Sequence, residues 1–245
     1  GDSGEDILRL LGTAGAAVSV SNIDTVLGAA GAGTETVTLM GAANVAVSSV
    51  DTVTGSTGTD SVTMLGAGSL TVSTIETVTG STSTTTNDVL RILGEGNTAV
   101  SVVETVLGSA STESVTMLSG TTLGVSAVDT VIGTSGAENV TLLGAGSTAV
   151  SAVATVTGST GTDTVTMLEA ATLAVRNVES VVGLTTTDDV VRMLAGGTVA
   201  VSNIASVMGS TGSADVLRII GGTETVTVTD IETVLGASGT DSVAL

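Results

Sequence analysis

The feature that most constrains this chain is an internal repeat of about 25 residues. A Val-x-Gly signature ends each repeat, and the closing glycines are Gly28, Gly55, Gly80, Gly108, Gly133, Gly158, Gly183, Gly209 and Gly236. Nine complete repeats are followed by the start of a tenth, which ends at Leu245. A period of this length predicts a solenoid, because one such unit cannot bury its apolar residues alone and must stack on its neighbours.

Apolar and polar residues alternate within each repeat. In the third repeat, Val62 and Met64 are two residues apart, and so are Leu70 and Val72. A period of two is typical of a strand with one buried face, and the abundant Val, Ile and Thr favour strands over helices. We therefore expect three short strands in each repeat. In the third repeat they are expected at residues 61–65, 69–73 and 76–79.

Two corners separate these strands. The Gly-Ala-Gly segment at residues 66–68 is the first, and Leu65 just before it breaks the alternation. Val72, Ile75 and Val78 are spaced by three, which predicts a bend between the second and third strands.

Three strands repeated in register predict an all-β fold, a right-handed parallel β-helix (β-solenoid) with one ~25-residue repeat per coil. The chain would then form a single domain over residues 1–245 with about nine and a half coils. Like residues would lie directly over like residues, ~4.8 Å apart, around an aliphatic core. Neither end carries a polar cap, so we expect either a slice of a longer array or head-to-tail stacking of copies.

The composition argues against most kinds of chemistry. The chain has no His, Cys, Pro or aromatic residue. It has five Arg and 24 acidic residues, which give a net charge of −19. We therefore expect no zinc or haem site, no His-assisted nucleophile and no platform for stacking bases. The negative charge repels nucleic acid, and no apolar run approaches the ~20 residues of a membrane helix. We expect that the chain is not an enzyme.

Acidic residues form two columns when the repeats are aligned. The first precedes the first strand and consists of Asp6, Glu35, Asp60, Asp88, Glu113, Glu138, Asp163, Asp189, Asp215 and Asp241. The second precedes the third strand and consists of Asp24, Asp51, Glu76, Glu104, Asp129, Glu179 and Glu232, with Ala154 and Ala205 interrupting it. Carboxylates stacked one coil apart would repel by ~0.9 kcal/mol per neighbour in water. Bound cations could offset this repulsion, and so could hydrogen bonds from loop N–H groups.

The loops before the first column carry a recognisable pattern. Residues 55–63 read GSTGTDSVT and residues 158–166 read GSTGTDTVT. This pattern resembles the G-G-x-G-x-D-x-U-x nonapeptide of RTX (haemolysin-type) calcium-binding repeats. The wider Val/Thr/Gly/Asp-rich composition is similar to repetitive arrays of large bacterial surface proteins and adhesins. The resemblance implies a bacterial secreted protein that binds Ca²⁺ between stacked turns, with the ten acids of the first column as candidate ligands.

Outward-facing positions suggest two further surfaces. The residue after the second acidic column is Thr or Ser in all nine repeats, as at Thr77, and such ladders resemble those of ice-binding proteins, although Thr also simply favours exposed strands. Arginines follow apolar residues by two positions in the first strands of four repeats. We predict a contact surface from Ile7, Arg9, Val89, Arg91, Val190, Arg192, Val216 and Arg218, together with Leu245 at the end of the chain. The alternative is that each Arg offsets the nearby acids.

The expected function is therefore that of a non-enzymatic structural protein, located outside the cell or at its surface. It would form a filament, a surface layer or an adhesin stalk, and its partners would be copies of itself, head-to-tail or side by side. Two alternatives stay open, a calcium-binding module that folds on secretion and an ice-binding solenoid.

Overall fold

A computed structural model describes residues 4–12, 15–29, 33–83, 87–109, 112–119, 122–134, 137–185, 188–212, 214–221 and 225–245. The chain divides into two compact units, Gly1–Ser119 and Gly120–Leu245. Every regular element in the described residues is a β-strand, and these residues contain no helix able to cross a membrane. The expectation of one continuous domain stays a prediction.

The first unit contains β1 (Ile7–Arg9), β2 (Ala17–Val20), β3 (Thr25–Leu27), β4 (Thr36–Leu39), β5 (Asn44–Ser48), β6 (Thr52–Thr54), β7 (Ser61–Met64), β8 (Ser69–Ser73), β9 (Thr77–Thr79), β10 (Val89–Ile92), β11 (Gly96–Ser101), β12 (Thr105–Leu107) and β13 (Glu113–Met117). The second unit contains β14 (Thr122–Ser126), β15 (Thr130–Ile132), β16 (Glu138–Leu142), β17 (Gly146–Ser151), β18 (Val153–Thr157), β19 (Asp163–Met167), β20 (Thr172–Arg176), β21 (Ser180–Val182), β22 (Val190–Met193), β23 (Gly197–Ser202), β24 (Ser206–Met208), β25 (Asp215–Ile219), β26 (Thr225–Thr229), β27 (Thr233–Leu235) and β28 (Ser242–Ala244).

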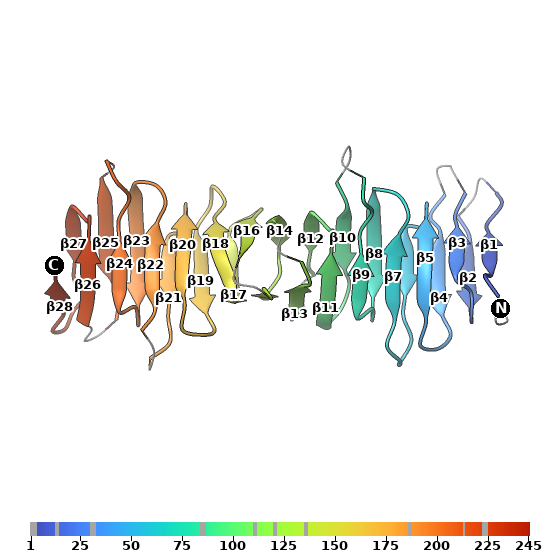
Figure 1. Cartoon of the computed structure of the whole chain (residues 1–245), viewed down its shortest axis with the longest axis horizontal. Coiled ribbons are helices and arrows are strands. Elements are labelled where there is room, and N and C mark those ends of the chain that lie inside the picture. Colours follow the sequence, from blue (N-terminus) through green and yellow to red (C-terminus); the bar gives the residue numbers. More distant parts are fainter. Residues whose placement is uncertain are drawn as a thin grey trace. The chain divides into compact units, whose positions relative to one another are not determined.

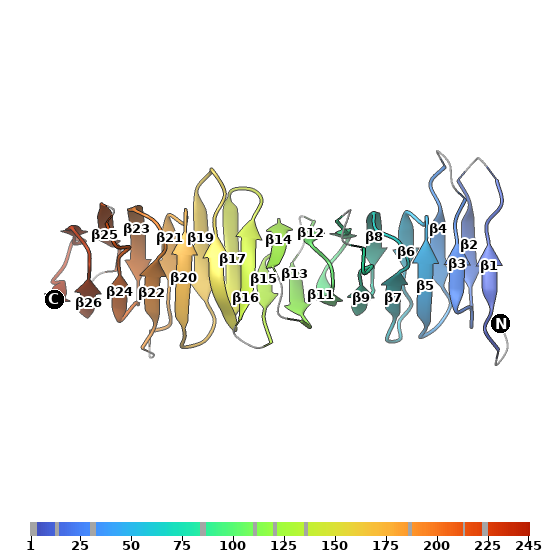
Figure 2. The same cartoon turned by 45° about the horizontal axis from the view of Figure 1, so that its top comes forward.

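Each unit is built from two parallel sheets that enclose an apolar core. In the first unit, one sheet has the order β1-β3-β5-β7-β9-β11-β13 and the other the order β2-β4-β6-β8-β10-β12. In the second unit, the even-numbered strands follow one another from β14 to β28 and the odd-numbered strands from β15 to β27. Successive strands thus alternate between the two sheets (Figures 1 and 2). This confirms an all-β parallel solenoid.

The expectation of three strands per coil is wrong, because each turn holds two strands. Ser61 pairs with Thr77 and Gly96 pairs with Glu113, so at these places a turn takes 16 and 17 residues (77 − 61 and 113 − 96). A three-strand repeat therefore covers one and a half turns, and the 28 strands make about 13 turns instead of nine and a half coils. Apolar periodicity identifies strands and bends, but it does not say which bend returns the chain to the sheet it left.

Like residues consequently do not lie directly over like residues. In the first unit, Val62 of β7 lies between Val45 and Val78, which belong to a second and a third strand. Along each sheet of a unit, a first strand of one repeat is followed by a third strand and then by a second strand, and this order repeats every three turns. Same-column residues in one sheet are therefore about 14 Å apart, three times the strand spacing.

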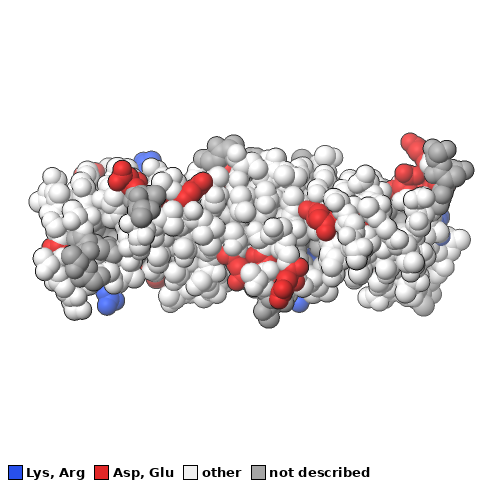
Figure 3. Space-filling view, turned by 90° about the horizontal axis from the view of Figure 1, so that it is seen from below, with Lys and Arg blue, Asp and Glu red and all other residues white. Residues whose placement is uncertain are grey.

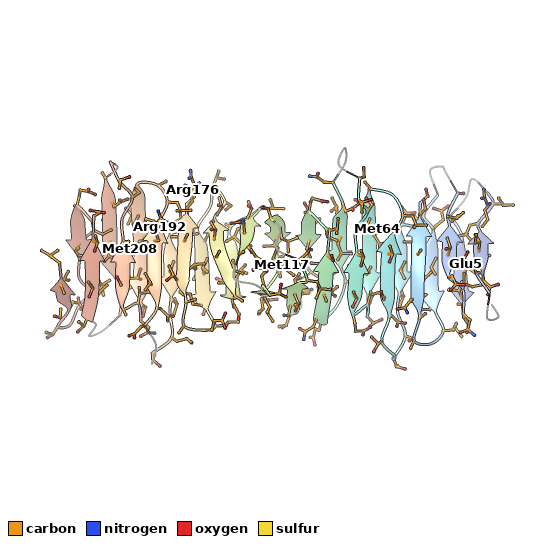
Figure 4. The ribbon with its side chains drawn as sticks, in the orientation of Figure 1. Glu5, Met64, Met117, Arg176, Arg192 and Met208 are labelled. Atoms are coloured by element: carbon orange, nitrogen blue, oxygen red, sulfur yellow. The ribbon has the colours of Figure 1, made fainter. Side chains whose placement is uncertain are left out.

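The core tolerates this mixed stacking because all three strand types present similar aliphatic side chains inward. Val62, Val78 and Val106 have no exposed surface. Met64 and Met117, which Figure 4 labels on β7 and β13, are 5% and 1% exposed. Each buried side chain of this size stabilises the fold by roughly 1.5–3 kcal/mol before the loss of chain entropy.

The predicted bend between the second and third strands is a single residue in the left-handed conformation. One non-glycine residue per repeat has φ between 51° and 57°: Asn22, Ser49, Thr74, Val102, Ala127, Ala152, Asn177, Asn203 and Asp230. The buried Ile75 follows Thr74 directly, so the spacing of three reports this corner. Leu65 lies just after β7 and is 52% exposed, in keeping with its predicted place at the other corner.

Candidate functional site

The acids of the first column are mostly buried. Glu35, Asp60, Asp88, Glu113, Glu138, Asp163, Asp189 and Asp215 are at most 3% exposed, whereas Asp6 and Asp241, in the first and last turns described, are partly exposed. Figure 3 shows one face of the molecule, where most visible side chains are uncharged despite the large excess of acids. The sequence charge therefore overstates the exposed charge.

Seven of the eight buried carboxylates accept hydrogen bonds from the loops around them: Asp60, Asp88, Glu113, Glu138, Asp163, Asp189 and Asp215. Asp60 Oδ2 accepts from the Ser56 N–H at 2.6 Å and the Ser56 hydroxyl at 3.0 Å, and Oδ1 accepts from the Ala43 N–H of the preceding turn at 2.9 Å. Asp163 repeats the arrangement with Ser159 at 2.6 and 2.9 Å and with the Gly146 N–H at 3.2 Å. Charge-assisted bonds of this kind are worth roughly 1.5–3 kcal/mol each. The carboxylate thus ties two successive turns together.

The closing glycine of the repeat is required by this packing. A Cβ at Gly158 would lie 1.9 Å from the carbonyl oxygen of Asn177, the left-handed corner of the next turn, and 2.9 Å from Asp163 Oδ2. A Cβ at Gly55 would meet Thr74 O at 1.9 Å and Asp60 Oδ2 at 2.8 Å. The glycine, the left-handed corner and the buried acid therefore form one recurring structural element.

The acids of the second column cap the backbone of the first. Glu76 Oε2 accepts the Asp60 N–H at 2.7 Å, and the Asp60 carbonyl accepts the N–H groups of Glu76 and Thr77 at 3.2 Å. The same side-chain cap, at 2.6–2.8 Å, joins Asp24 to Asp6, Asp51 to Glu35, Glu104 to Asp88, Glu179 to Asp163 and Glu232 to Asp215. Each of these six acids of the second column thus lies one turn beyond an acid of the first.

These contacts revise the picture of a continuous acid ladder. Same-column acids in one sheet are three turns apart, so their mutual repulsion is far weaker than expected for neighbouring coils. Loop N–H groups, one of the two alternatives from the sequence, supply compensation for the buried charges. Among the described residues, no three acidic side chains cluster closely enough to hold a metal. Calcium coordination by the ten acids stays a prediction.

The predicted arginines lie on outward strand positions beside long apolar side chains. Arg9 pairs in register with Leu27, Arg91 with Leu107, Arg192 with Met208 and Arg218 with Leu235. Figure 4 labels Arg192 and Met208 on the neighbouring strands β22 and β24. We call each arginine, its cross-strand Leu or Met and the apolar residue two positions before it (Ile7, Val89, Val190 or Val216) an Arg patch.

The sequence did not predict that these Leu and Met residues lie next to the arginines. Where the first strand carries Thr at the arginine position, the paired residue is Thr in three repeats: Thr54, Thr79 and Thr157. In the Arg repeats it is always Leu or Met. This correlation was present in the sequence, but only the two-strand turn makes the two positions neighbours. Leu245 lies beyond β28, fully exposed and apart from the arginines.

The Arg patches are exposed and carry unpaired charge. All four arginines are exposed, and within the described part of the chain none forms an ion pair with an acid. The alternative that each Arg offsets a nearby acid therefore has no contact to support it. Each unit carries one Arg patch on its odd-numbered strands (Arg9, Arg218) and one on its even-numbered strands (Arg91, Arg192).

A second outward surface consists of hydroxyl groups. On the even-numbered sheet of the first unit, Thr36 and Thr38 of β4 pair with Thr52 and Thr54 of β6. Thr52 and Thr54 in turn pair with Thr71 and Ser73 of β8. These three strands form two rows of three hydroxyls, with about 4.8 Å between strands and about 6.6 Å along them. Ser19 of β2 pairs with Thr38 and extends one row to four.

No protein-family model, curated protein or solved structure matches this chain.

Proposed function

We propose that this chain is a non-enzymatic structural protein of the bacterial cell surface, and that copies of it associate side by side through their Arg patches. The solenoid supplies a stiff support, because the buried acids, the closing glycines and the left-handed corners all serve to join one turn to the next. The finer expectations of a right-handed coil and a filament, surface layer or adhesin stalk belong to the same proposal.

The observation that carries the proposal is the pairing of the arginine of each Arg patch with an exposed or half-buried Leu or Met. An apolar contact area with arginine at its centre is typical of energetically important positions in protein interfaces. Acids of the second column such as Asp51 and Glu179 are exposed, so another copy offers the complementary charge. An extracellular location follows only from the resemblance to secreted arrays and needs its own test by fractionation of the host.

Sedimentation velocity and negative-stain electron microscopy test the association. The wild-type chain is expected to form concentration-dependent assemblies. A variant with Arg9, Arg91, Arg192 and Arg218 all changed to Gln should remain monomeric while keeping its circular dichroism spectrum. If both chains sediment as monomers at high concentration, the proposal is wrong.

The hydroxyl rows on β4, β6 and β8 favour ice binding as a second candidate function. A regularly spaced array of hydroxyl groups can hold ordered water in a lattice. Inhibition of ice recrystallisation should then be lost in Thr52→Lys but kept in Thr105→Lys, which lies on β12 outside the rows. Equal activity of the two variants, or no activity in the wild type, would remove this candidate.

A further inference from the structure

The three corner types of the repeat differ in length, and this creates grooves along the edges of each unit. On one edge of the first unit, the short corner at residues 49–51 lies between the segments that link β3 to β4 and β7 to β8. A groove of about 410 Å³ lies at this short corner. We call it the Asp51 groove; its lining includes Glu35, Ser48, Ser49, Val50 and Asp51.

The Asp51 groove is acidic with an apolar component. Asp51 is exposed and accepts the Glu35 N–H at 2.8 Å through Oδ2, which leaves carboxylate lone pairs for further donors. Serine hydroxyls and aliphatic atoms of Val47, Val50 and Leu70 complete the lining. A guanidinium on an aliphatic stem matches both features, since the charge meets a carboxylate and the stem meets apolar surface.

We propose that the Asp51 groove is the receptor for an Arg patch of a second copy of this chain. This inference rests on the proposed side-by-side association and adds the partner surface. The Arg patches lie on the outer faces of the sheets and the groove lies on an edge, so the contact joins two different surfaces. Such a heterologous contact leaves a free patch and a free groove on each new copy. Assembly is therefore open-ended.

The second unit provides an internal comparison. An equivalent groove of about 430 Å³ lies at the corner after β20, but its lining includes Arg176 at the position that Ser48 holds in the first. That guanidinium would repel an incoming arginine. At the corner after β17, with Ser151 in the same column, the corresponding space is only about 10 Å³. The Asp51 groove has both the space and an acid without a neighbouring arginine in its lining, whereas the second groove contains Arg176 and the third has almost no space.

The experiment compares Asp51→Asn and Glu179→Gln in the full chain by sedimentation velocity at about 0.15 M ionic strength, where long-range effects of charge are screened. Asp51→Asn keeps an oxygen for the Glu35 N–H, and Glu179→Gln is the matched change in the groove that Arg176 lines. Asp51→Asn should raise the dissociation constant at least tenfold, whereas Glu179→Gln should leave it unchanged. Circular dichroism confirms that each variant is folded.

Two outcomes overturn the inference in distinguishable ways. If Asp51→Asn associates like the wild type while the four-fold Arg→Gln variant does not, the Arg patches act on another surface and only the groove assignment fails. If the wild type stays monomeric yet its arginines retain it on immobilised polyglutamate, its partner is a different anionic polymer, and both the groove and the proposed self-association fail.

Discussion

The repeat with β7 and β9 and the repeat with β10 and β12 share an inner surface but differ on the outside. In the first, Val62 pairs with Val78, and in the second Leu90 pairs with Val106; all four are fully buried. The inner rows alone thus maintain the same register in both repeats.

Outside, the same two strand pairs have little in common. Thr63 pairs with Thr79 in one repeat, whereas Arg91 pairs with Leu107 in the other. Neither pair alters the strand register, so the outer face of this fold can vary without cost to the inner one. Positions where the repeats carry different residues are therefore the candidates for function, and positions where they carry similar residues are the ones that stabilise the fold.

The largest effect is expected from breaking the shared interior. Val78→Asp and Val106→Asp each place a carboxylate in a fully buried row, and each should destabilise the chain by about 4 kcal/mol or more. Urea unfolding measures the loss. Thr79→Asp, outward on the same strand as Val78, is the control and should cost less than about 1 kcal/mol. A large difference between the two buried variants would contradict a common interior.

The next largest effect is the difference in stability loss between removing an acid of the first column and removing one of the second. Asp163→Ala removes a buried acceptor of several N–H and hydroxyl bonds and should cost about 3 kcal/mol. Glu179→Ala removes only the exposed cap and should cost about 1 kcal/mol or less, since the chain itself has alanine in that column at 154 and 205. Thermal unfolding of both variants measures the ratio. Equal losses would show that burial is not what distinguishes the columns.

The outward pair of one repeat can be replaced by the outward pair of the other. The double variant Thr63→Arg, Thr79→Leu creates a new pair of the kind found in the Arg patches. Stability should change by less than about 1 kcal/mol, because cross-strand pairs contribute little. Self-association should strengthen, and sedimentation velocity detects it. An unchanged dissociation constant would mean that the pair alone does not make a patch.

A smaller gain is expected at the left-handed corners, which both kinds of repeat share. Val102 has φ of 57°, a conformation that β-branched residues rarely adopt, whereas Asn177 occupies the same corner in another repeat. Val102→Asn should stabilise the chain by about 1 kcal/mol. The midpoint of urea unfolding tests this, and Ala152→Asn should give a smaller rise. A loss of stability in Val102→Asn would argue against strain at this corner.

The smallest effect is expected from calcium. The buried carboxylates already accept loop N–H groups, so millimolar Ca²⁺ should shift the unfolding temperature by less than about 2 °C. Calorimetry with and without a chelator measures the shift. A rise of tens of degrees would instead favour the calcium-binding module implied by the resemblance to RTX repeats.

Much of the local structure could be predicted from the sequence. The strands expected at 61–65, 69–73 and 76–79 were found at Ser61–Met64, Ser69–Ser73 and Thr77–Thr79. Their inward residues and the bend before Ile75 were also confirmed. These features depend on side-chain period and on local backbone conformation, both of which a single repeat displays.

The closure of the turn could not be predicted in the same way. It depends on which two corners bring strands back into register, and the aliphatic rows of all three strand types fit one another equally well. The partner of Asp60 in the preceding turn, Ala43, depended on that closure, and so did the neighbour of each arginine. Contacts between turns were therefore misassigned, although most of the residues that make them had been identified.

Because three strands per repeat is an odd number and each turn uses two, the array has a parity. Insertion or loss of one repeat would move every later residue to the opposite sheet, whereas a change of two repeats would restore all of them to their original sides. If a partner binds one sheet of the solenoid, its binding residues stay on that sheet only when repeats are gained or lost in pairs, about 50 residues at a time.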